Sequence, residues 1–261
     1  MISLTQYDGA KLMLAEKPAT IVSLVPSITE NLIQFGTIPA ARTSFCIEPK
    51  DIVQSIPVIG GTKTPRVKKI IDMKPDLVIA NQEENIREHI EQIQAAGIPV
   101  WVTYPATVQD LVPLMQELGE VSDDPEMAMH WINQTRKRLT QKLHWTFKPK
   151  IVTLIWKDPW MAVGKDTYTS SLIEFCGGIN PVKGRYPALT MQQIQEMSPD
   201  ILLLPTEPYE FDHQDFEVWK RVVPEVISFS GEDLLWSGTR WLEAAQRLTE
   251  ICKSFQEKQL K

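Results

Sequence analysis

The 261-residue sequence has few cysteines, no long apolar run and no leader-like start. Its three cysteines, Cys46, Cys176 and Cys252, form no CxxC pair, so they predict buried free thiols rather than a disulfide framework. No apolar stretch approaches the roughly 18 to 20 residues of a membrane span. The first twenty residues lack the apolar core and cleavage site of a signal peptide. From the lack of a signal peptide we expect a cytoplasmic protein; the alternative is a periplasmic or otherwise extracytoplasmic protein whose leader has been removed.

The sequence also lacks a basic excess and the common catalytic motifs. Its 27 Lys and Arg against 33 Asp and Glu give a net charge of −6 and a pI near 5.4, which disfavours nucleic-acid binding. It contains no GxSxG elbow, no P-loop and no GxGxxG. None of its four histidines has a second ligand at a recognised metal-binding spacing. We therefore expect a protein that is not an enzyme, with no catalytic residue, no metal site and no intrinsic cofactor.

What the sequence does contain is a regular alternation of short apolar runs and helical segments. The runs at residues 20–25 (TIVSLV) and 76–80 (DLVIA), and later at 150–156 and 200–204, are rich in the residues of buried strands. Helical segments such as Val67–Met73 separate them. This βα alternation is typical of a parallel sheet that is covered on both faces.

The two halves of the chain repeat each other. Residues 71–79 (IDMKPDLVI) return as residues 195–203 (QEMSPDILL). Residues 32–35 (LIQF) return as residues 172–175 (LIEF), and a glycine follows closely after both of these shorter segments. Residues 20–24 (TIVSL) likewise return as residues 150–154 (KIVTL). Three matches in the same order favour two similar α/β units.

A long helix is predicted between the halves, from Asp124 to Trp145. Asp124 can cap its first turn and Pro125 suits the first helical position. Apolar residues recur at multiples of four and predict the buried stripe: Met127, Trp131, Leu139 and Leu143. The predicted fold is therefore α/β, with two Rossmann-like lobes that have parallel sheets and are joined by a single long helix. The predicted boundaries are 1–118 for the first lobe, 119–148 for the linker helix and 149–261 for the second lobe.

This architecture predicts where a ligand binds. In open parallel sheets, ligands lie outside the carboxyl ends of the strands, so two such lobes predict a ligand cleft between them. Large aromatic side chains there could stack on a flat ligand, and arginines could hold carboxylates or phosphates. The candidate ligand-binding residues, all in segments that follow predicted strands, are Ser27, Phe45, Thr62, Asn81, Tyr104, Trp156, Trp160, Arg185, Tyr186, Trp236 and Arg240.

Several motifs in a fixed order also carry a family resemblance. They are residues 21–30 (IVSLVPSITE), 57–61 (PVIGG), 73–80 (MKPDLVIA), 174–180 (EFCGGIN) and 197–204 (MSPDILLL). The sequence resembles the type III, or helical-backbone, substrate-binding proteins of ABC importers, and most of all their cobalamin-binding branch. The resemblance implies a non-catalytic protein that binds a corrinoid, haem or another tetrapyrrole, or a ferric siderophore in the cleft.

The resemblance also implies an ABC permease as partner, but the sequence departs from the family there. Importer members carry one glutamate on the exposed top of each lobe, which pairs with permease arginines. At these positions this sequence has Lys68, followed by Lys69, and Gln192, followed by Gln193. A lysine facing an arginine is repulsive, so the usual docking is not expected.

Two hypotheses from other classes stay open. One is a cytoplasmic enzyme or chaperone of metal-cofactor handling that uses Cys46 or His213 as its reactive group. The other is a regulatory protein on the same fold, whose replaced docking residues face a different partner.

Overall fold

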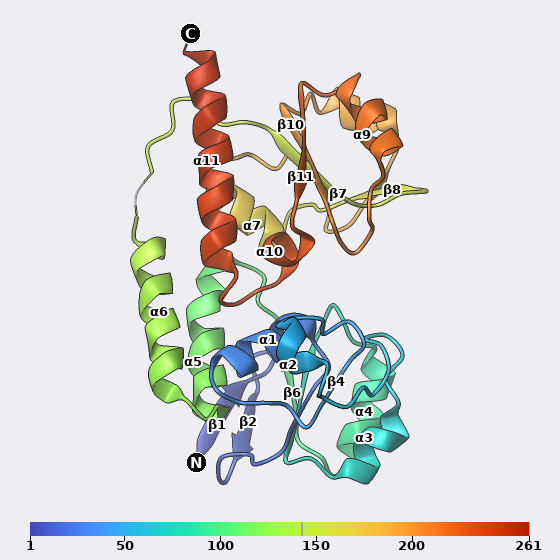
Figure 1. The fold of residues 1–261 in the computed structure, drawn as a ribbon, viewed down its shortest axis with the longest axis vertical. Helices are drawn as coiled ribbons and strands as arrows, with labels where there is room; N and C mark the ends of the chain where they lie inside the picture. The colour runs from blue at the N-terminus through green and yellow to red at the C-terminus, as the bar shows by residue number, and fades with distance from the viewer. Residues whose placement is uncertain (142, 261) are drawn as a thin grey trace. The chain divides into compact units, whose positions relative to one another are not determined.

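The computed structural model describes residues 1–141 and 143–260, in which the chain forms two compact units (Figure 1). The first unit holds Met1–Pro105 and Leu111–Lys137, and the second holds Ala106–Asp110 and Arg138–Lys261. Residues 142 and 261, which fall in the predicted linker helix and the predicted second lobe, lie outside the described residues. Each unit is described by itself below.

The first unit is built on a parallel sheet of four strands in the order β4-β3-β5-β6. Its strands are β3 (Ile21–Ser23), β4 (Ala41–Arg42), β5 (Leu77–Asn81) and β6 (Val100–Thr103). A separate antiparallel hairpin is formed by β1 (Ile2–Thr5) and β2 (Lys11–Leu14). The helices of this unit are α1 (Pro26–Gln34), α2 (Lys50–Val53), α3 (Val67–Met73), α4 (Arg87–Ala95), α5 (Leu111–Val121) and α6 (Pro125–Leu139).

Helices cover the first sheet because its strands are apolar on both faces. Val22 and Val78 pack in one core cluster with Ile70 of α3 and Ile93 of α4, and all four side chains are buried. Figure 1 shows α3 and α4 together on one side of this unit and α1 and α5 on the other. The alternation read from the sequence is thus a sheet between two helical layers.

The second unit is built on a five-stranded sheet in the order β11-β10-β7-β8-β9. Its strands are β7 (Ile151–Trp156), β8 (Trp160–Ala162), β9 (Ala188–Leu189), β10 (Ile201–Pro205) and β11 (Glu225–Phe229). β7, β10 and β11 are parallel, as predicted, whereas β8 and β9 pair antiparallel with their neighbours. The two short strands were not predicted, because two or three residues carry too little pattern to indicate a strand.

Helices pack on both faces of the second sheet, α7 and α11 on one side and α9 on the other in Figure 1. The helical segments of this unit are the 3-10 turn η1 (Val108–Asp110), α7 (Tyr168–Phe175), α8 (Met191–Glu196), α9 (His213–Lys220), α10 (Gly231–Leu235) and α11 (Trp241–Gln259). Val152 and Leu202 of the sheet share a core cluster with Ile194 of α8 and Trp219 of α9. Throughout the residues that are described, no helix has both the length and the apolar character that crossing a bilayer requires. The predicted α/β class, with parallel sheets in two sets, is confirmed.

The sequence repeat has a structural counterpart in the two units. The Asp76 carboxylate accepts hydrogen bonds from the N–H and hydroxyl of Thr20, both at 2.8 Å, just before β3. In the second unit, Asp200 accepts from the N–H of Lys150 at 2.7 Å, just before β7. The hydrogen bonds from Thr20 lower the pKa of Asp76, and the bond from the Thr20 hydroxyl is the main cause. Each aspartate of the repeated Pro-Asp pair therefore aligns its own strand with the central strand of its sheet.

The predicted linker helix is shorter than expected and turned about its axis. α6 ends at Leu139 rather than Trp145, and its buried residues are Ala128, Ile132 and Thr135. Met127, in the predicted stripe, is instead exposed. The close approach of α5 explains which face of α6 is buried. A Cβ added to Gly119 of α5 would lie 2.9 Å from the Cβ of Ala128, so the two helices can meet this closely only where both residues are small. The role of the segment as a linker between lobes stays a prediction.

Candidate functional site

Aromatic side chains form a continuous chain at the carboxyl end of β7 in the second unit. Trp156 lies edge-on to Tyr209 with 5.4 Å between ring centroids, and Tyr209 lies 4.9 Å from Phe211. Phe211 stacks on Trp160, which meets Trp219 at 5.2 Å. We call these five residues the aromatic chain. It runs from Trp156, which is 45% exposed, to Trp219, which is fully buried, so a surface indole is supported by rings that reach the core.

Local hydrogen bonds position the aromatic chain. Trp156 is the last residue of β7 and Trp160 the first of β8, so the turn between the strands presents both. Within that turn the Lys157 ammonium lies 2.6 Å from Asp215 and 6.0 Å from the Trp160 ring centroid. The hydrogen bond to Asp215 raises the pKa of Lys157 above its ordinary value. Asp215 also forms a capping box with Asp212, which fixes the start of α9 and the loop before it.

Two predicted ligand contacts of this unit are engaged inside the protein. Trp236 is only 7% exposed, and the Arg240 guanidinium lies 5.5 Å from the centroid of its ring. Arg240 donates to Asp233 at 3.0 Å, and Arg247 donates to the other oxygen of Asp233 at 3.0 Å. A buried carboxylate between two arginines has a clear structural role. That Trp236 and Arg240 bind ligand stays a prediction.

The predicted pair Arg185 and Tyr186 precedes β9, the edge strand of the second sheet. Leu189 pairs with Trp160 and Ala188 with Met161, so the chain enters β9 at the end away from the Trp156–Trp160 turn. The Arg185 guanidinium lies 5.9 Å from the Tyr186 ring centroid. Ala188 is level with Trp156, because both pair with Met161, so Tyr186 lies two residues from that level. That Arg185 and Tyr186 bind ligand stays a prediction.

Glu207, which was not among the candidate ligand-binding residues, lies at the carboxyl edge where the fold predicts a ligand. It follows β10 and is half-buried beside α10. Burial and the negative charge of Glu232 raise its pKa to about 7, although a hydrogen bond from Trp236 and the charge of Arg240 act in the opposite direction. The sequence signal that could have identified Glu207 is its position as an acidic residue shortly after an apolar strand.

The first unit brings five predicted residues to the carboxyl edge of its own sheet. Asn81, at the end of β5, uses its side-chain oxygen to accept from the N–H of Glu83 at 2.8 Å, so it shapes the turn. Ser27 is buried in the first turn of α1, and Thr62 and Tyr104 are partly buried. Phe45 is 59% exposed, and its ring lies so close to Gly61 that a Cβ there would approach it to 3.2 Å. Phe45 is thus the member of this group with the largest open surface.

Cys46 and His213, the reactive groups of the alternative hypothesis, have no support from the structure. Cys46 is fully buried between the hydroxyls of Thr29 and Thr43, at 3.0 and 3.2 Å. Burial raises the pKa of its thiol, so the nucleophilic thiolate is disfavoured. His213 is exposed at the start of α9, with Glu217 as its neighbour at 4.0 Å. The described residues contain no group of three or more His, Cys, Asp or Glu that could hold a metal ion.

The burial of the thiols predicts that they are unreactive. Native protein should not react with a disulfide reagent such as Ellman's reagent within minutes, whereas all three free cysteines should react in urea. Burial also raises the pKa of Cys176 to about 11 and of Cys252 to about 12, which acts in the same direction. Cys46→Ala should leave ligand affinity unchanged. Rapid reaction of one native thiol, lost in Cys46→Ala, would contradict this expectation.

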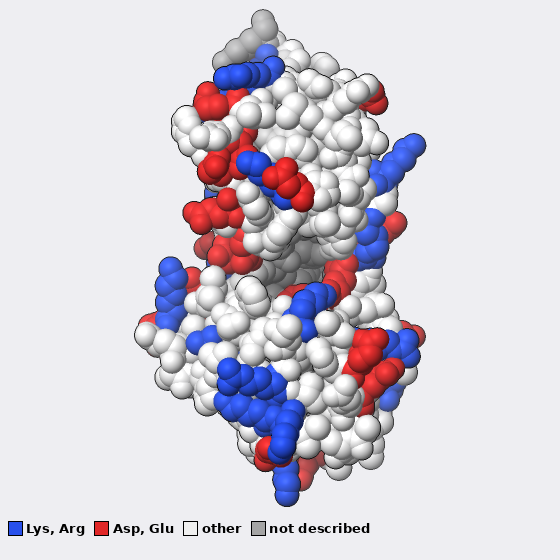
Figure 2. Space-filling model, turned by 90° about the vertical axis from the view of Figure 1, so that its right-hand side faces the viewer, with Lys and Arg blue, Asp and Glu red and all other residues white. Residues whose placement is uncertain are grey.

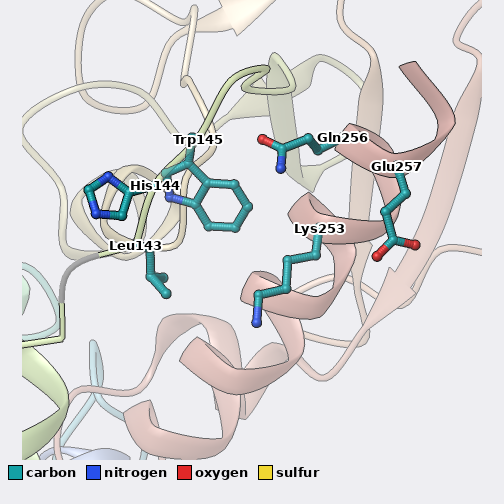
Figure 3. A pocket seen from close by; sticks show the side chains of 6 residues that line it. All are labelled: Leu143, His144, Trp145, Lys253, Gln256 and Glu257. Carbon is teal, nitrogen blue, oxygen red and sulfur yellow. The ribbon is translucent and has the colours of Figure 1, made fainter. Parts of the chain in front are cut away.

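A pocket of about 300 Å³ lies at another place in the second unit (Figure 3). It is lined by Leu143, His144, Trp145, Lys253, Gln256 and Glu257. Figure 3 shows the last three projecting from α11 and the indole of Trp145 facing them. The first three precede β7, so the pocket lies by the amino end of that strand, and it contains none of the predicted ligand residues. It is not the edge at which parallel sheets bind ligands.

Comparisons with known proteins agree with this geometry. The sequence model of the periplasmic binding protein family matches residues 21–217. A vitamin B12-binding protein of Vibrio parahaemolyticus is 23% identical over 95% of this chain and 93% of its own. Among solved structures, the periplasmic vitamin B12 binding protein of Vibrio cholerae has a TM-score of 0.79 at 18% identity and covers 90% of this chain and 97% of its own. The periplasmic heme-binding protein of Roseiflexus sp. RS-1 has a TM-score of 0.74 at 20% identity and covers 93% and 99%.

The comparisons correct the expectation of a cytoplasmic location. The matching family and the similar solved structures are periplasmic binding proteins, which points away from the cytoplasm. The expectation was wrong because it depended on the first twenty residues alone, and a leader that has been removed leaves no trace in them.

Proposed function

The chain belongs to the periplasmic binding protein family, and from this premise we propose that it binds a corrinoid or a related tetrapyrrole, with a ferric siderophore as the next candidate. It is a non-catalytic binding protein, as its relatives are. The ligand assignment draws on the vitamin B12-binding and heme-binding relatives. The chain's own residues must then supply a surface for a large, flat molecule.

The observation that carries the proposal is the aromatic chain at the carboxyl end of β7. Trp156 leaves 45% of its surface open at this edge, while Tyr209 and the rings behind it hold it in place. A rigid, exposed indole loses little conformational entropy when a flat ligand stacks on it. In the first unit, the exposed Phe45 ring offers a second apolar surface at the carboxyl edge of its own sheet.

Fluorescence titration tests the proposal. Cyanocobalamin, hemin and a ferric catecholate siderophore are added separately to the purified protein, and tryptophan emission is recorded. Cyanocobalamin or hemin should quench the emission to saturation at a one-to-one ratio, because both absorb light and would stack on Trp156. Unchanged emission with all three compounds would rule out the proposed ligand class.

The surface on α3 bears on the protein partner. Residues 63–74 carry five Lys or Arg and one acid, a local charge of +4 in a chain of net charge −6. Figure 2 shows Lys and Arg side chains gathered low on this face, over the part of the first unit that carries α3. Lys68 pairs with Asp72 of its own helix, at 3.1 Å, and both are largely exposed. We propose that a protein that meets α3, a permease or another partner, presents acidic side chains there.

The same surface yields a prediction about ligand binding. The double variant Lys68→Glu with Gln192→Glu, which restores the usual docking charges, should bind cyanocobalamin with an affinity within about twofold of wild type. Surface substitutions of this kind change the free energy of unfolding by about 0.5 kcal/mol or less, and neither position is predicted to contact the ligand. Lys68 has an 89% exposed side chain, and Gln192 donates to Glu196 on its own exposed helix at 2.9 Å. A loss of affinity of about tenfold or more in the titration would show that these residues contact the ligand.

A further inference from the structure

Glu207 is held firmly at the carboxyl end of β10. The preceding residue, Thr206, donates its N–H to the carbonyl of Phe229 at 3.0 Å and accepts from the N–H of Gly231 at 3.0 Å. Gly231 packs so closely that a Cβ added to it would lie 2.2 Å from the Cγ of Glu207. The backbone and the Cγ of Glu207 therefore have a fixed place at the proposed ligand edge.

The charges around Glu207 do not neutralise it. Glu232 on α10 repels its ionised form, while Arg240 attracts it and the Trp236 indole donates a hydrogen bond to it. Arg240, however, also donates to Asp233 at 3.0 Å, and Asp233 holds Arg247 as well. The burial of Glu207 and the charge of Glu232 outweigh the opposing effects of Trp236 and Arg240, and they raise the pKa of Glu207 to about 7.

We infer that ligand binding at this edge takes up a proton at Glu207, and that the ligand group meeting Glu207 is an uncharged acceptor such as an amide carbonyl. The inference rests on the proposed function. A ligand that covers Glu207 removes water from it, which favours the neutral carboxyl further. The neutral carboxyl has one O–H to donate. A ligand carboxylate placed there would instead face Glu232 and the ionised form of Glu207.

The direction of the pH dependence follows from linkage. In the free protein, Glu207 is protonated below about pH 7, so binding there needs no proton and affinity is constant with pH. Above that pH, each binding event must first protonate the carboxylate. Affinity should therefore fall by about tenfold per pH unit above pH 7, until the pKa of the bound state is reached.

Isothermal titration calorimetry tests the inference with the whole protein and cyanocobalamin as the probe. Near pH 8, titrations in two buffers with different ionisation enthalpies should show the uptake of nearly one proton, and affinity should fall between about pH 7 and about pH 8. Glu207→Gln should bind with no proton uptake and with an affinity that does not change with pH. Glu210→Gln, an exposed acid in the same loop, is the matched control and should behave as wild type.

The outcomes separate the inference from the proposed function. Wild-type binding without proton uptake would overturn the inference and leave the proposed function standing, and this readout does not depend on any variant folding. A wild-type pH slope retained in Glu207→Gln would also overturn it. If wild-type protein binds none of cyanocobalamin, hemin and the ferric siderophore at any pH, both the proposed function and the inference fail.

Discussion

Trp156→Ala is expected to weaken cyanocobalamin binding about thirtyfold, which corresponds to about 2 kcal/mol of binding free energy. The indole is 45% exposed at the carboxyl end of β7, and its edge contact with Tyr209, at 5.4 Å, fixes its orientation. Stacking on a ligand would bury the open part of the ring, and alanine removes nearly all of that area. Fluorescence or calorimetric titration of the variant measures the loss.

Phe147→Ala is the matched control for this prediction. Phe147 is 43% exposed, close to the value for Trp156, but it lies before β7 and so by the amino end of the same strand. Its replacement should leave affinity unchanged. If the two variants lose the same affinity, or if only Phe147→Ala does, ligand binding is not located at the carboxyl edge.

Trp219→Ala is expected to destabilise the protein by about 3 to 5 kcal/mol. Trp219 is fully buried in the core of the second unit, where Trp160 meets it at 5.2 Å. Its removal leaves a cavity at the buried end of the aromatic chain, so the free energy of unfolding, measured by urea denaturation followed by circular dichroism, should fall.

Trp219→Phe provides the comparison. The Trp219 Nε1 has no hydrogen-bond partner among the described residues, so phenylalanine removes volume but no hydrogen bond. Its cost should be about 1 to 2 kcal/mol. Equal losses in the two variants would show that the cavity is not the cause of the destabilisation, and no loss in Trp219→Ala would contradict the core position of this residue.

The fold could be read from the sequence to a large extent because its signals are local and repeated. The Pro-Asp pairs at residues 75–76 and 199–200 mark the same hydrogen-bonded junction in both units. The helix endings agree as well, since Lys74 and Ser198, just before these pairs, both have positive φ values near 50°. Such features depend on a few neighbouring residues, which a single sequence displays directly.

The buried face of α6 could not be predicted from the sequence in the same way. Large apolar residues indicated a stripe through Met127 and Trp131, but the buried face runs through Ala128 and Ile132. The deciding factor is the small Gly119 of α5, which faces Ala128 across a close contact. That contact belongs to tertiary packing, and hydrophobic periodicity within one helix carries no information on it.

The candidate site was predictable in part for a similar reason. Trp156 and Trp160 follow a strand that the sequence shows clearly, and the structure places both in the aromatic chain. Trp236 has equal apolar character, yet it is buried beside Arg240. Glu207 was missed because its neighbour Glu232 lies 25 residues further along the chain.

The central claim is that a tetrapyrrole-type ligand binds at the carboxyl ends of the parallel strands. A crystal structure of the protein grown with cyanocobalamin tests it most directly. The predicted result is electron density for the corrin ring against Trp156, with an amide group at Glu207. Density in the pocket between Trp145 and α11, or ligand-free crystals at saturating cyanocobalamin, would contradict it.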